Sequence, residues 1–164
     1  MRFRHSATLG AAVLALGLVA SGSSVADTAS EVAAIRAVNQ AFVTAYNSGD
    51  VDSMVSLYDE HAVVLPPGAP GARGRTAIRA YLAQDVAASV KGGITLSFGS
   101  KEDDGVSGST GWASGTYLAK DKSGHVVETG KFLSVYHKKD GKWLYYRDTW
   151  NSDGPPPPTA PAKK

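Results

Sequence analysis

The sequence has 164 residues, with 17 lysines and arginines against 15 aspartates and glutamates, and it contains no cysteine. The absence of cysteine excludes a disulfide framework, a thiolate nucleophile and a cysteine-ligated metal. The nearly balanced charge gives no electrostatic reason to expect a nucleic acid or an anionic membrane as a partner.

The first 26 residues have the organisation of a secretory signal peptide. Arg2 and Arg4 give a basic start, residues 7–20 carry no charge, and small residues precede a cleavage site after Ala26. A membrane span needs about 20 apolar residues, and this run is shorter. We therefore predict cleavage after Ala26, a secreted or periplasmic protein, and no membrane span in the mature chain. Cleavage leaves 15 basic and 15 acidic residues.

The rest of the chain divides into one domain and a tail. Residues 27–151 have the length of one ordinary domain, and no internal repeat is visible. Residues 152–164 include four consecutive prolines, which favour polyproline II and donate no backbone hydrogen bonds. We predict that this Pro-rich tail is disordered.

A long amphipathic helix is predicted at the start of the domain. Thr28 and Glu31 have capping-box spacing ahead of it. Apolar residues then recur every three or four positions, as expected for one buried helix face: Val32, Ile35, Val38 (or Asn39), Phe42 and Tyr46. Gly49 suits a left-handed residue after this helix, and Asp50 suits the N-cap of the next.

Two further helices and one strand follow. A short helix would bury Met54, Val55, Leu57 and Tyr58. Residues 62–65 predict a brief β-branched strand that is stopped by Pro66, Pro67 and Gly68. A third helix is predicted from Thr76, with an inner face of Ile78, Tyr81, Leu82 and Val86.

From Gly93 onward the apolar period changes from 3.6 to 2, which predicts strands. Residues 94–98 alternate, and three more strands are expected at 112–118, 126–136 and 143–150. Turn signals separate them at residues 103–105, 122–124 and 140–141. Helices followed by a four-strand meander indicate an α+β fold in which the helices cover one face of the sheet.

Four segments resemble the nuclear transport factor 2-like superfamily, in its SnoaL-like and ketosteroid-isomerase-like bacterial branch. They are AYNSGDVDSMVSLYDEHAVVLPPG, GRTAIRAYL, GTYLAKD and GKFLSVYHKKDGKWLYYRDTWNSD, in the order and spacing of that family. The resemblance implies a cone-shaped, cystatin-like α+β barrel in residues 27–151, with a strongly bent mixed sheet around the N-terminal helices and a cavity at its open end. It also implies a homodimer formed through the sheet.

The resemblance does not name a reaction, because this fold hosts isomerases, cyclases, dehydratases and binding proteins. Ketosteroid isomerases combine a carboxylate base with tyrosine and protonated aspartic acid donors. Aligned through the N-x-G-D turn, the tyrosine position falls on Phe42, the base on Pro66 and the second donor near Leu133 or Ser134. Steroid isomerisation is therefore disfavoured.

Asp148, in LYYRDTW, is the candidate catalytic residue. Strict alternation places Leu144, Tyr146, Asp148 and Trp150 on one strand face. Burial among rings would raise the pKa of the Asp148 carboxyl and suit it to acid or base catalysis. The alternative is a structural carboxylate paired with Arg147, Arg79 or a backbone donor.

Aromatic residues supply the predicted ligand pocket. Tyr46 and Tyr58, from the first two helices, and Tyr117, from GTYLA, are candidate hydroxyl donors, although a buried tyrosine more often bonds to the protein itself. The predicted pocket comprises Phe42, Tyr46, Tyr58, Leu65, Tyr117, Tyr146 and Trp150.

No cofactor or metal is predicted. His61 follows Asp59 and Glu60, but adjacent side chains diverge and the usual ligand spacings are absent. Lys131 is read as an edge lysine rather than a cavity cation.

Three functions remain open. The first is binding of a small apolar or amphipathic molecule in an aromatic-lined cavity. The second is an enzyme of isomerase, cyclase or dehydratase type that uses Asp148 as its acid or base. The third is a non-catalytic interaction module that uses the outer sheet face and the Pro-rich tail.

Overall fold

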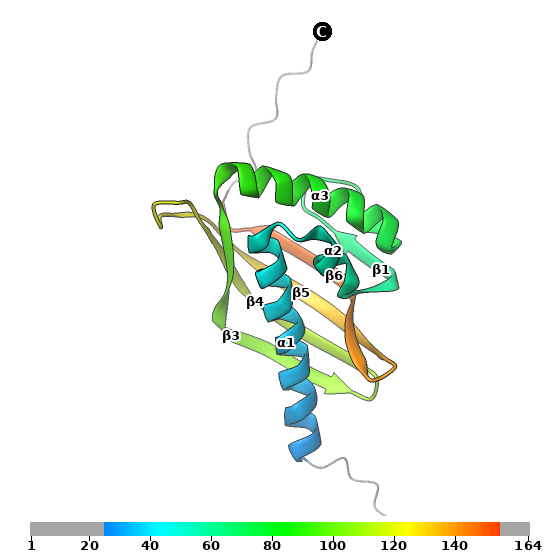
Figure 1. Ribbon diagram of the computed structural model, residues 1–164. Coiled ribbons are helices and arrows are strands. Elements are labelled where there is room, and N and C mark those ends of the chain that lie inside the picture. Colours follow the sequence, from blue (N-terminus) through cyan, green and yellow to red (C-terminus); the bar gives the residue numbers. More distant parts are fainter. Residues whose placement is uncertain (1–24, 155–164) are drawn as a thin grey trace, which may run out of the picture.

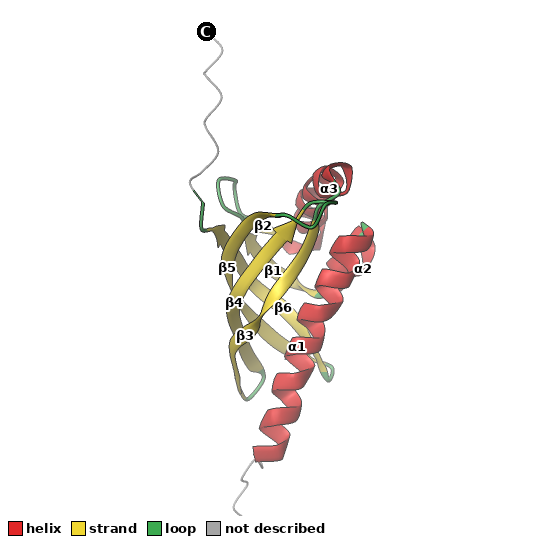
Figure 2. Ribbon diagram, turned by 90° about the vertical axis from the view of Figure 1, so that its left-hand side faces the viewer, coloured by secondary structure: helices red, strands yellow, loops and turns green. Residues whose placement is uncertain are grey.

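A curled, mixed β-sheet wraps around one long helix, and two further helices lie on the same side of the sheet (Figure 1; Figure 2). The computed structural model describes residues 25–154, apart from the side chains of residues 25, 26, 101 and 102. The helices are α1 (Val25–Ser48), α2 (Val51–Ser56) and α3 (Gly74–Gly92). The strands are β1 (Tyr58–Leu65), β2 (Ala72–Arg73), β3 (Thr95–Ser107), β4 (Thr110–Lys120), β5 (Val126–Lys139) and β6 (Lys142–Ser152).

The sheet has the strand order β2-β1-β6-β5-β4-β3. All neighbouring pairs are antiparallel except β1 and β6, which run parallel. The predicted fold class is therefore confirmed: the protein is α+β, with a mixed sheet around N-terminal helices. The two-residue strand β2 was not predicted, because so short a segment carries no alternation.

The start of α1 differs from the prediction. The helix already begins at Val25, so Thr28 does not cap it. The carboxylate of Glu31 instead accepts hydrogen bonds from Lys138 Nζ (2.5 Å) and from Trp143 Nε1 (2.6 Å). Glu31 therefore ties α1 to β5 and β6.

The buried face of α1 includes one polar residue. Ile35 is fully buried and Asn39 is 2% exposed. The hydroxyls of Tyr136 and Tyr145 both donate to Oδ1 of Asn39, the latter over 2.7 Å. Two tyrosines of the sheet thus use the Asn39 amide as their acceptor, which explains a buried amide on this face.

The turn after α1 has the predicted conformation. Gly49 has φ +76°, in the left-handed region. The side chain of Asp50 caps α2 by accepting from the Ser53 amide over 2.9 Å. Helix α2 then ends at Ser56, because the Leu57 carbonyl accepts from the Tyr145 amide and draws the chain into the sheet. The prediction that Tyr58 belongs to α2 was wrong, since Tyr58 opens β1.

The predicted turn at residues 103–105 was also wrong. Strand β3 continues through these residues to Ser107. Gly105 lies opposite Trp112, and a Cβ on Gly105 would be 2.3 Å from the Trp112 ring. Asp104 forms an ion pair with Arg36 over 2.5 Å. These turn-forming residue types serve packing and charge pairing here.

The hairpin turns at residues 122–124 and 140–141 are confirmed. Asp121 Oδ1 accepts from the amides of Ser123 and His125. Asp140 and Gly141 both have positive φ, at 50° and 76°.

The predicted signal peptide falls almost entirely outside the described residues, as does the tail from residue 155. Within residues 25–154, no helix is long and apolar enough to cross a membrane.

Candidate functional site

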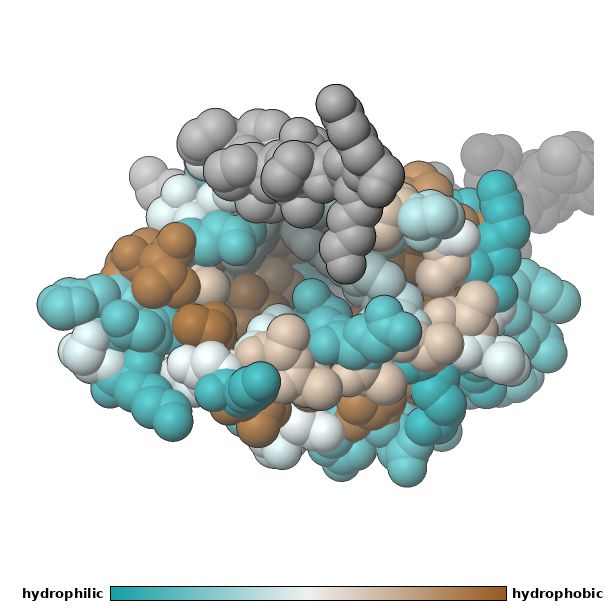
Figure 3. Space-filling view, turned by 90° about the horizontal axis from the view of Figure 1, so that it is seen from above, coloured by the Kyte–Doolittle hydropathy of each residue, from teal (hydrophilic) through white to brown (hydrophobic). Residues whose placement is uncertain are grey.

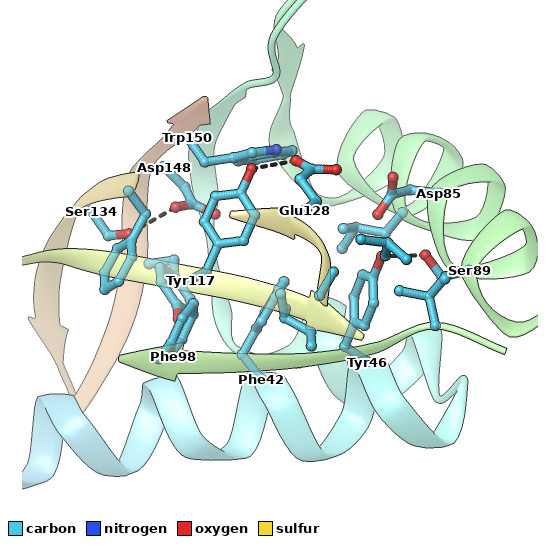
Figure 4. A pocket seen from close by; sticks show the side chains of 17 residues that line it. Phe42, Tyr46, Asp85, Ser89, Phe98, Tyr117, Glu128, Ser134, Asp148 and Trp150 are labelled. Carbon is cyan, nitrogen blue, oxygen red and sulfur yellow. Dashed lines mark hydrogen bonds between the residues drawn. The ribbon is translucent and has the colours of Figure 1, made fainter. Parts of the chain in front are cut away.

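The open end of the cone contains a cavity of about 280 Å³. It lies between the end of α1, the middle of α3 and the concave face of β3 to β6 (Figure 4). Viewed from the end where α3 lies, the surface is hollowed and apolar side chains line the hollow (Figure 3). Aromatic rings form much of the wall: Phe42, Tyr46, Phe98, Tyr117, Phe132, Tyr145 and Trp150.

Asp148 lies in the wall of this cavity and is 8% exposed. Its Oδ2 accepts from the Tyr58 hydroxyl and its Oδ1 from the Ser134 hydroxyl, each over 2.7 Å. Burial raises the pKa of the Asp148 carboxyl, and these two donors oppose the rise only in part. The cavity wall therefore contains a carboxyl group that keeps its proton to a higher pH than an ordinary aspartic acid.

The arginines proposed as partners of Asp148 lie elsewhere. Arg147 stacks over the Tyr146 ring, 3.7 Å from its centroid, and Arg79 forms an ion pair with Asp52. Asp148 is thus held by neutral hydroxyls rather than by a salt bridge.

A β-bulge decides which aromatic residues of β6 face the cavity. The register of β5 and β6 shifts between Val135 and Tyr136. Tyr145, 2% exposed, therefore points inward along with Asp148 and Trp150, although strict alternation would separate them. The expectation that Tyr146 lines the pocket was wrong, because Tyr146 stacks on His137 with 3.6 Å between ring centroids.

Two other predicted pocket residues lie outside the cavity lining. Tyr58 is 1% exposed and lies behind the cavity wall, where it contacts Asp148. Leu65 is 47% exposed at the end of β1. The predicted positions of Tyr58 and Leu65 in the pocket were therefore wrong, and Tyr58 contacts the site from behind, through the Asp148 carboxylate and the ring of Tyr145.

The remaining predicted residues, Phe42, Tyr46, Tyr117 and Trp150, do line the cavity. The hydroxyls of Tyr46 and Ser89 hydrogen-bond over 2.5 Å, and Tyr117 donates to Glu128 Oε1 over 2.6 Å. Desolvation raises the pKa of the Tyr46 hydroxyl to about 12. Burial also raises the pKa of the Tyr117 hydroxyl, so both hydroxyls stay protonated near neutral pH, and the single proton of Tyr117 is already donated to Glu128.

Two acidic residues that line the cavity were not predicted from the sequence. On α3, Asp85 lies three residues after the buried Leu82 and one before the buried Val86. On β5, Glu128 is an even number of residues from the buried Phe132 and Ser134 and therefore lies on the same strand face. The helical spacing could have predicted the position of Asp85, and the strand alternation that of Glu128. Burial, with the negative charge of Glu128, raises the pKa of the Asp85 carboxyl.

Only some of the positions aligned with ketosteroid isomerase residues lie at the cavity. Phe42 lines the cavity without a donor, and Pro66 is buried outside the lining. Leu133 is 49% exposed on the outer sheet face, whereas Ser134 lines the cavity and bonds to Asp148. Of these positions, only Ser134 brings a polar group to the site.

No group of three or more histidines, aspartates or glutamates in the described part of the chain lies close enough to hold a metal ion. Glu60 pairs with Lys139, and Asp59 accepts from the His61 amide over 2.7 Å. Lys131 pairs with Asp153 over 2.8 Å and does not line the cavity.

The fold and the cavity define a cone-shaped α+β protein with a deep aromatic pocket. A family model described as a SnoaL-like domain matches residues 39–146, more than half of the chain. The chain therefore belongs to the SnoaL-like family. No functionally curated protein matches it.

Solved structures with low sequence identity share the fold. A nuclear transport factor 2-like protein with a cystatin-like fold from Novosphingobium aromaticivorans is 20% identical, with a TM-score of 0.68 over 82% of this chain and 94% of that one. A ketosteroid isomerase-like protein from Erwinia carotovora is 21% identical, with a TM-score of 0.58 over 76% and 98%. A protein of unknown function from Pseudomonas putida is 13% identical, with a TM-score of 0.68 over 76% and 87%.

Proposed function

We propose that the protein binds a small apolar or amphipathic molecule in the central cavity. The observation that carries this proposal is a cavity of about 280 Å³ walled by aromatic rings, with a few polar groups at defined places. Small-molecule sites have this composition, and a space of this kind at the open end of a cone would otherwise expose apolar surface to water. We further propose that the protein is secreted or periplasmic, as its first 26 residues predict.

Native mass spectrometry of the protein purified from the extracytoplasmic fraction of its host would test both parts. We expect a reproducible small-molecule adduct on a chain that begins at Asp27. Ala119 lines the cavity, so Ala119→Phe should fill it and abolish the adduct, whereas Ala83→Phe on the exposed face of α3 should not. An adduct that survives Ala119→Phe would place the ligand elsewhere. An intact chain in that fraction would contradict the predicted cleavage.

A second candidate is an enzyme that acts on the same ligand with Asp148 as acid or base. The buried Asp148 carboxyl, its raised pKa and its place in the cavity wall favour it. A carboxyl with a raised pKa keeps its proton closer to neutral pH, where it can act as a general acid, and its carboxylate is a stronger base than an ordinary one. Tyr46, whose bond with Ser89 can run in either direction, would offer a hydrogen bond to the developing charge, whereas the Tyr117 hydroxyl already donates to Glu128.

Turnover of an identified ligand by the Asp148→Asn variant tests this candidate. We expect kcat to fall by about 100-fold or more, the usual size of a lost acid or base. Unchanged turnover would exclude Asp148 as the acid or base, and no turnover by the wild-type protein would leave binding as the function.

A further inference from the structure

The charged side chains that line the cavity are all acidic. Among residues 25–154, Asp85, Glu128 and Asp148 line the cavity, and no lysine, arginine or histidine does. A site for an anionic ligand would be expected to provide the opposite arrangement. The described lining thus combines aromatic walls with acidic side chains.

Asp85 and Glu128 reach the cavity from two different elements. Asp85 projects from α3 and Glu128 from the start of β5, and the two carboxylates extend toward the same part of the cavity (Figure 4). The negative charge of Glu128 contributes to the raised pKa of Asp85, as expected for two like charges that share a site. A positive charge placed between them would relieve this repulsion.

Neither carboxylate forms an ion pair with a cation from the part of the chain that the structure describes. The ion pairs formed within residues 25–154 use other acidic residues, such as Asp52, Asp104 and Asp153. The Glu128 carboxylate receives a neutral donor, the Tyr117 hydroxyl, and no cation contributes to the shift at Asp85. The negative charge of the pair is therefore available to a ligand.

The rings beside these carboxylates suit a cation as well as an apolar body. Tyr117, held by its bond to Glu128, and Trp150 both line the cavity. The face of an aromatic ring attracts an ammonium group, and desolvation strengthens the attraction. Phe42, Phe98 and Phe132 also line the cavity and offer apolar surface to the rest of the ligand.

We infer that the cavity selects a cationic amphiphile, with its ammonium group between Asp85 and Glu128 and its apolar body against the phenylalanine rings. This inference rests on the proposed binding function and adds the chemical class of the ligand. Asp148 contributes less to the selection, because its two oxygens already accept from Tyr58 and Ser134.

Three probes that share one ring system test the inference by isothermal titration calorimetry at pH 7.5 and low salt. Tryptamine is cationic, 3-ethylindole is neutral and indole-3-propionate is anionic. We expect tryptamine to bind about tenfold tighter than 3-ethylindole, because both Coulomb and cation–π attraction favour it. The anionic probe should bind weakest.

The outcomes separate the two claims. Equal binding of the cationic and neutral probes, or tighter binding of the anionic one, would overturn the inference and leave the proposed binding function intact. Binding by none of the three would overturn the proposed function for ligands of this size, and the inference with it.

Matched variants locate the charge preference. Asp85→Asn and Glu128→Gln should each weaken tryptamine binding by about three- to tenfold, and the double variant should bind tryptamine and 3-ethylindole alike. Affinity for 3-ethylindole is the internal control, since it should not change. Asp140→Asn removes a carboxylate from the distant β5–β6 turn, where asparagine tolerates the φ of 50°, and should leave the preference unaltered. A preference for tryptamine that persists in the double variant would overturn the assignment.

Discussion

The Tyr58 hydroxyl donates to the Asp148 carboxylate over 2.7 Å, in a contact that joins the first residue of β1 to the centre of β6. Both residues are almost completely buried. Together with Ser134, Tyr58 determines how the carboxylate is held in the cavity wall. This contact therefore couples the stability of the fold to the ionisation of the candidate site.

Tyr58→Phe removes one of the two donors to Asp148 and leaves a buried carboxylate oxygen without its partner. We expect the free energy of unfolding to fall by about 1–3 kcal/mol, the usual cost of an unsatisfied buried group. The pKa of Asp148 should rise further, because a donor that favours the charged form is lost. Urea unfolding at pH 5 and pH 8 measures both effects, and the cost should be larger at pH 8.

Tyr146→Phe is the matched control for this prediction. It removes the same hydroxyl from a tyrosine on the outer face of β6 and keeps the ring that stacks on His137. We expect little change at either pH. A cost for Tyr58→Phe that is the same at both pH values would show that the contact does not act through the ionised carboxylate.

Asp148→Asn tests the direction of the raised pKa. In the folded protein this carboxyl holds its proton above the pH at which the unfolded chain, with an ordinary pKa of about 3.9, has lost it. The folded state then binds more protons, so this group's contribution to stability falls as pH rises through that window. The variant cannot titrate there, so its stability relative to the wild type should increase from pH 4 to pH 7.

The difference between the two proteins is the quantity to measure, because other titrating groups cancel from it. Urea unfolding of both proteins at pH 4, 5, 6 and 7 provides it. A variant that loses stability relative to the wild type as pH rises would mean that the folded protein favours the ionised carboxylate.

Much of the fold could be predicted because its signals are local. The apolar spacing of α1, the Gly49–Asp50 turn and the alternation in β4 and β5 depend on residues close in sequence. The run of β3 through Gly105 could not be predicted, since the glycine is required by the Trp112 ring of the neighbouring strand. Glycine and aspartate indicate a turn unless such a distant contact is known.

The candidate site was predictable only in part, for a similar reason. Asp148 and Trp150 were placed correctly relative to each other, because two residues of an unbroken strand face the same side. The bulge that precedes them turns Tyr145 toward the cavity in place of Tyr146. Its position depends on the pairing of β6 with Val135 and Tyr136 of β5, which the sequence of β6 alone does not reveal. Ser134 was set aside because a hydroxyl is not the donor that steroid isomerisation needs.

Exposed apolar side chains on the outer face of the sheet favour self-association, which the family resemblance also implies. Leu133 (49% exposed) and Trp112 (39% exposed) present apolar side chains there. We propose that this face joins two copies, and we expect sedimentation velocity to give twice the mass of one chain at micromolar concentration. Leu133→Lys should reduce the mass to that of one chain, whereas Val126→Lys, at the exposed β4–β5 hairpin, should not. A single-chain mass for the wild type would overturn the proposal.

Gly130→Ala should disturb the cavity wall by displacing the Tyr117 ring. Gly130 lies opposite Tyr117, and a Cβ there would be 2.4 Å from the Tyr117 ring and 2.4 Å from the backbone oxygen of Asn151. The ring cannot keep its position, so its hydroxyl should lose the bond to Glu128. We expect a loss of about 1–3 kcal/mol in the free energy of unfolding, as for overpacked cores, together with weaker binding of tryptamine.

Gly154→Ala, where the nearest atom is 3.5 Å away, is the control and should change neither. Tyr117→Phe separates the two causes, because it removes the bond to Glu128 without moving the ring. If Gly130→Ala lowers stability but binds tryptamine as tightly as the wild type, the position of the Tyr117 ring does not matter to the ligand, and the cation must be held by the carboxylates alone.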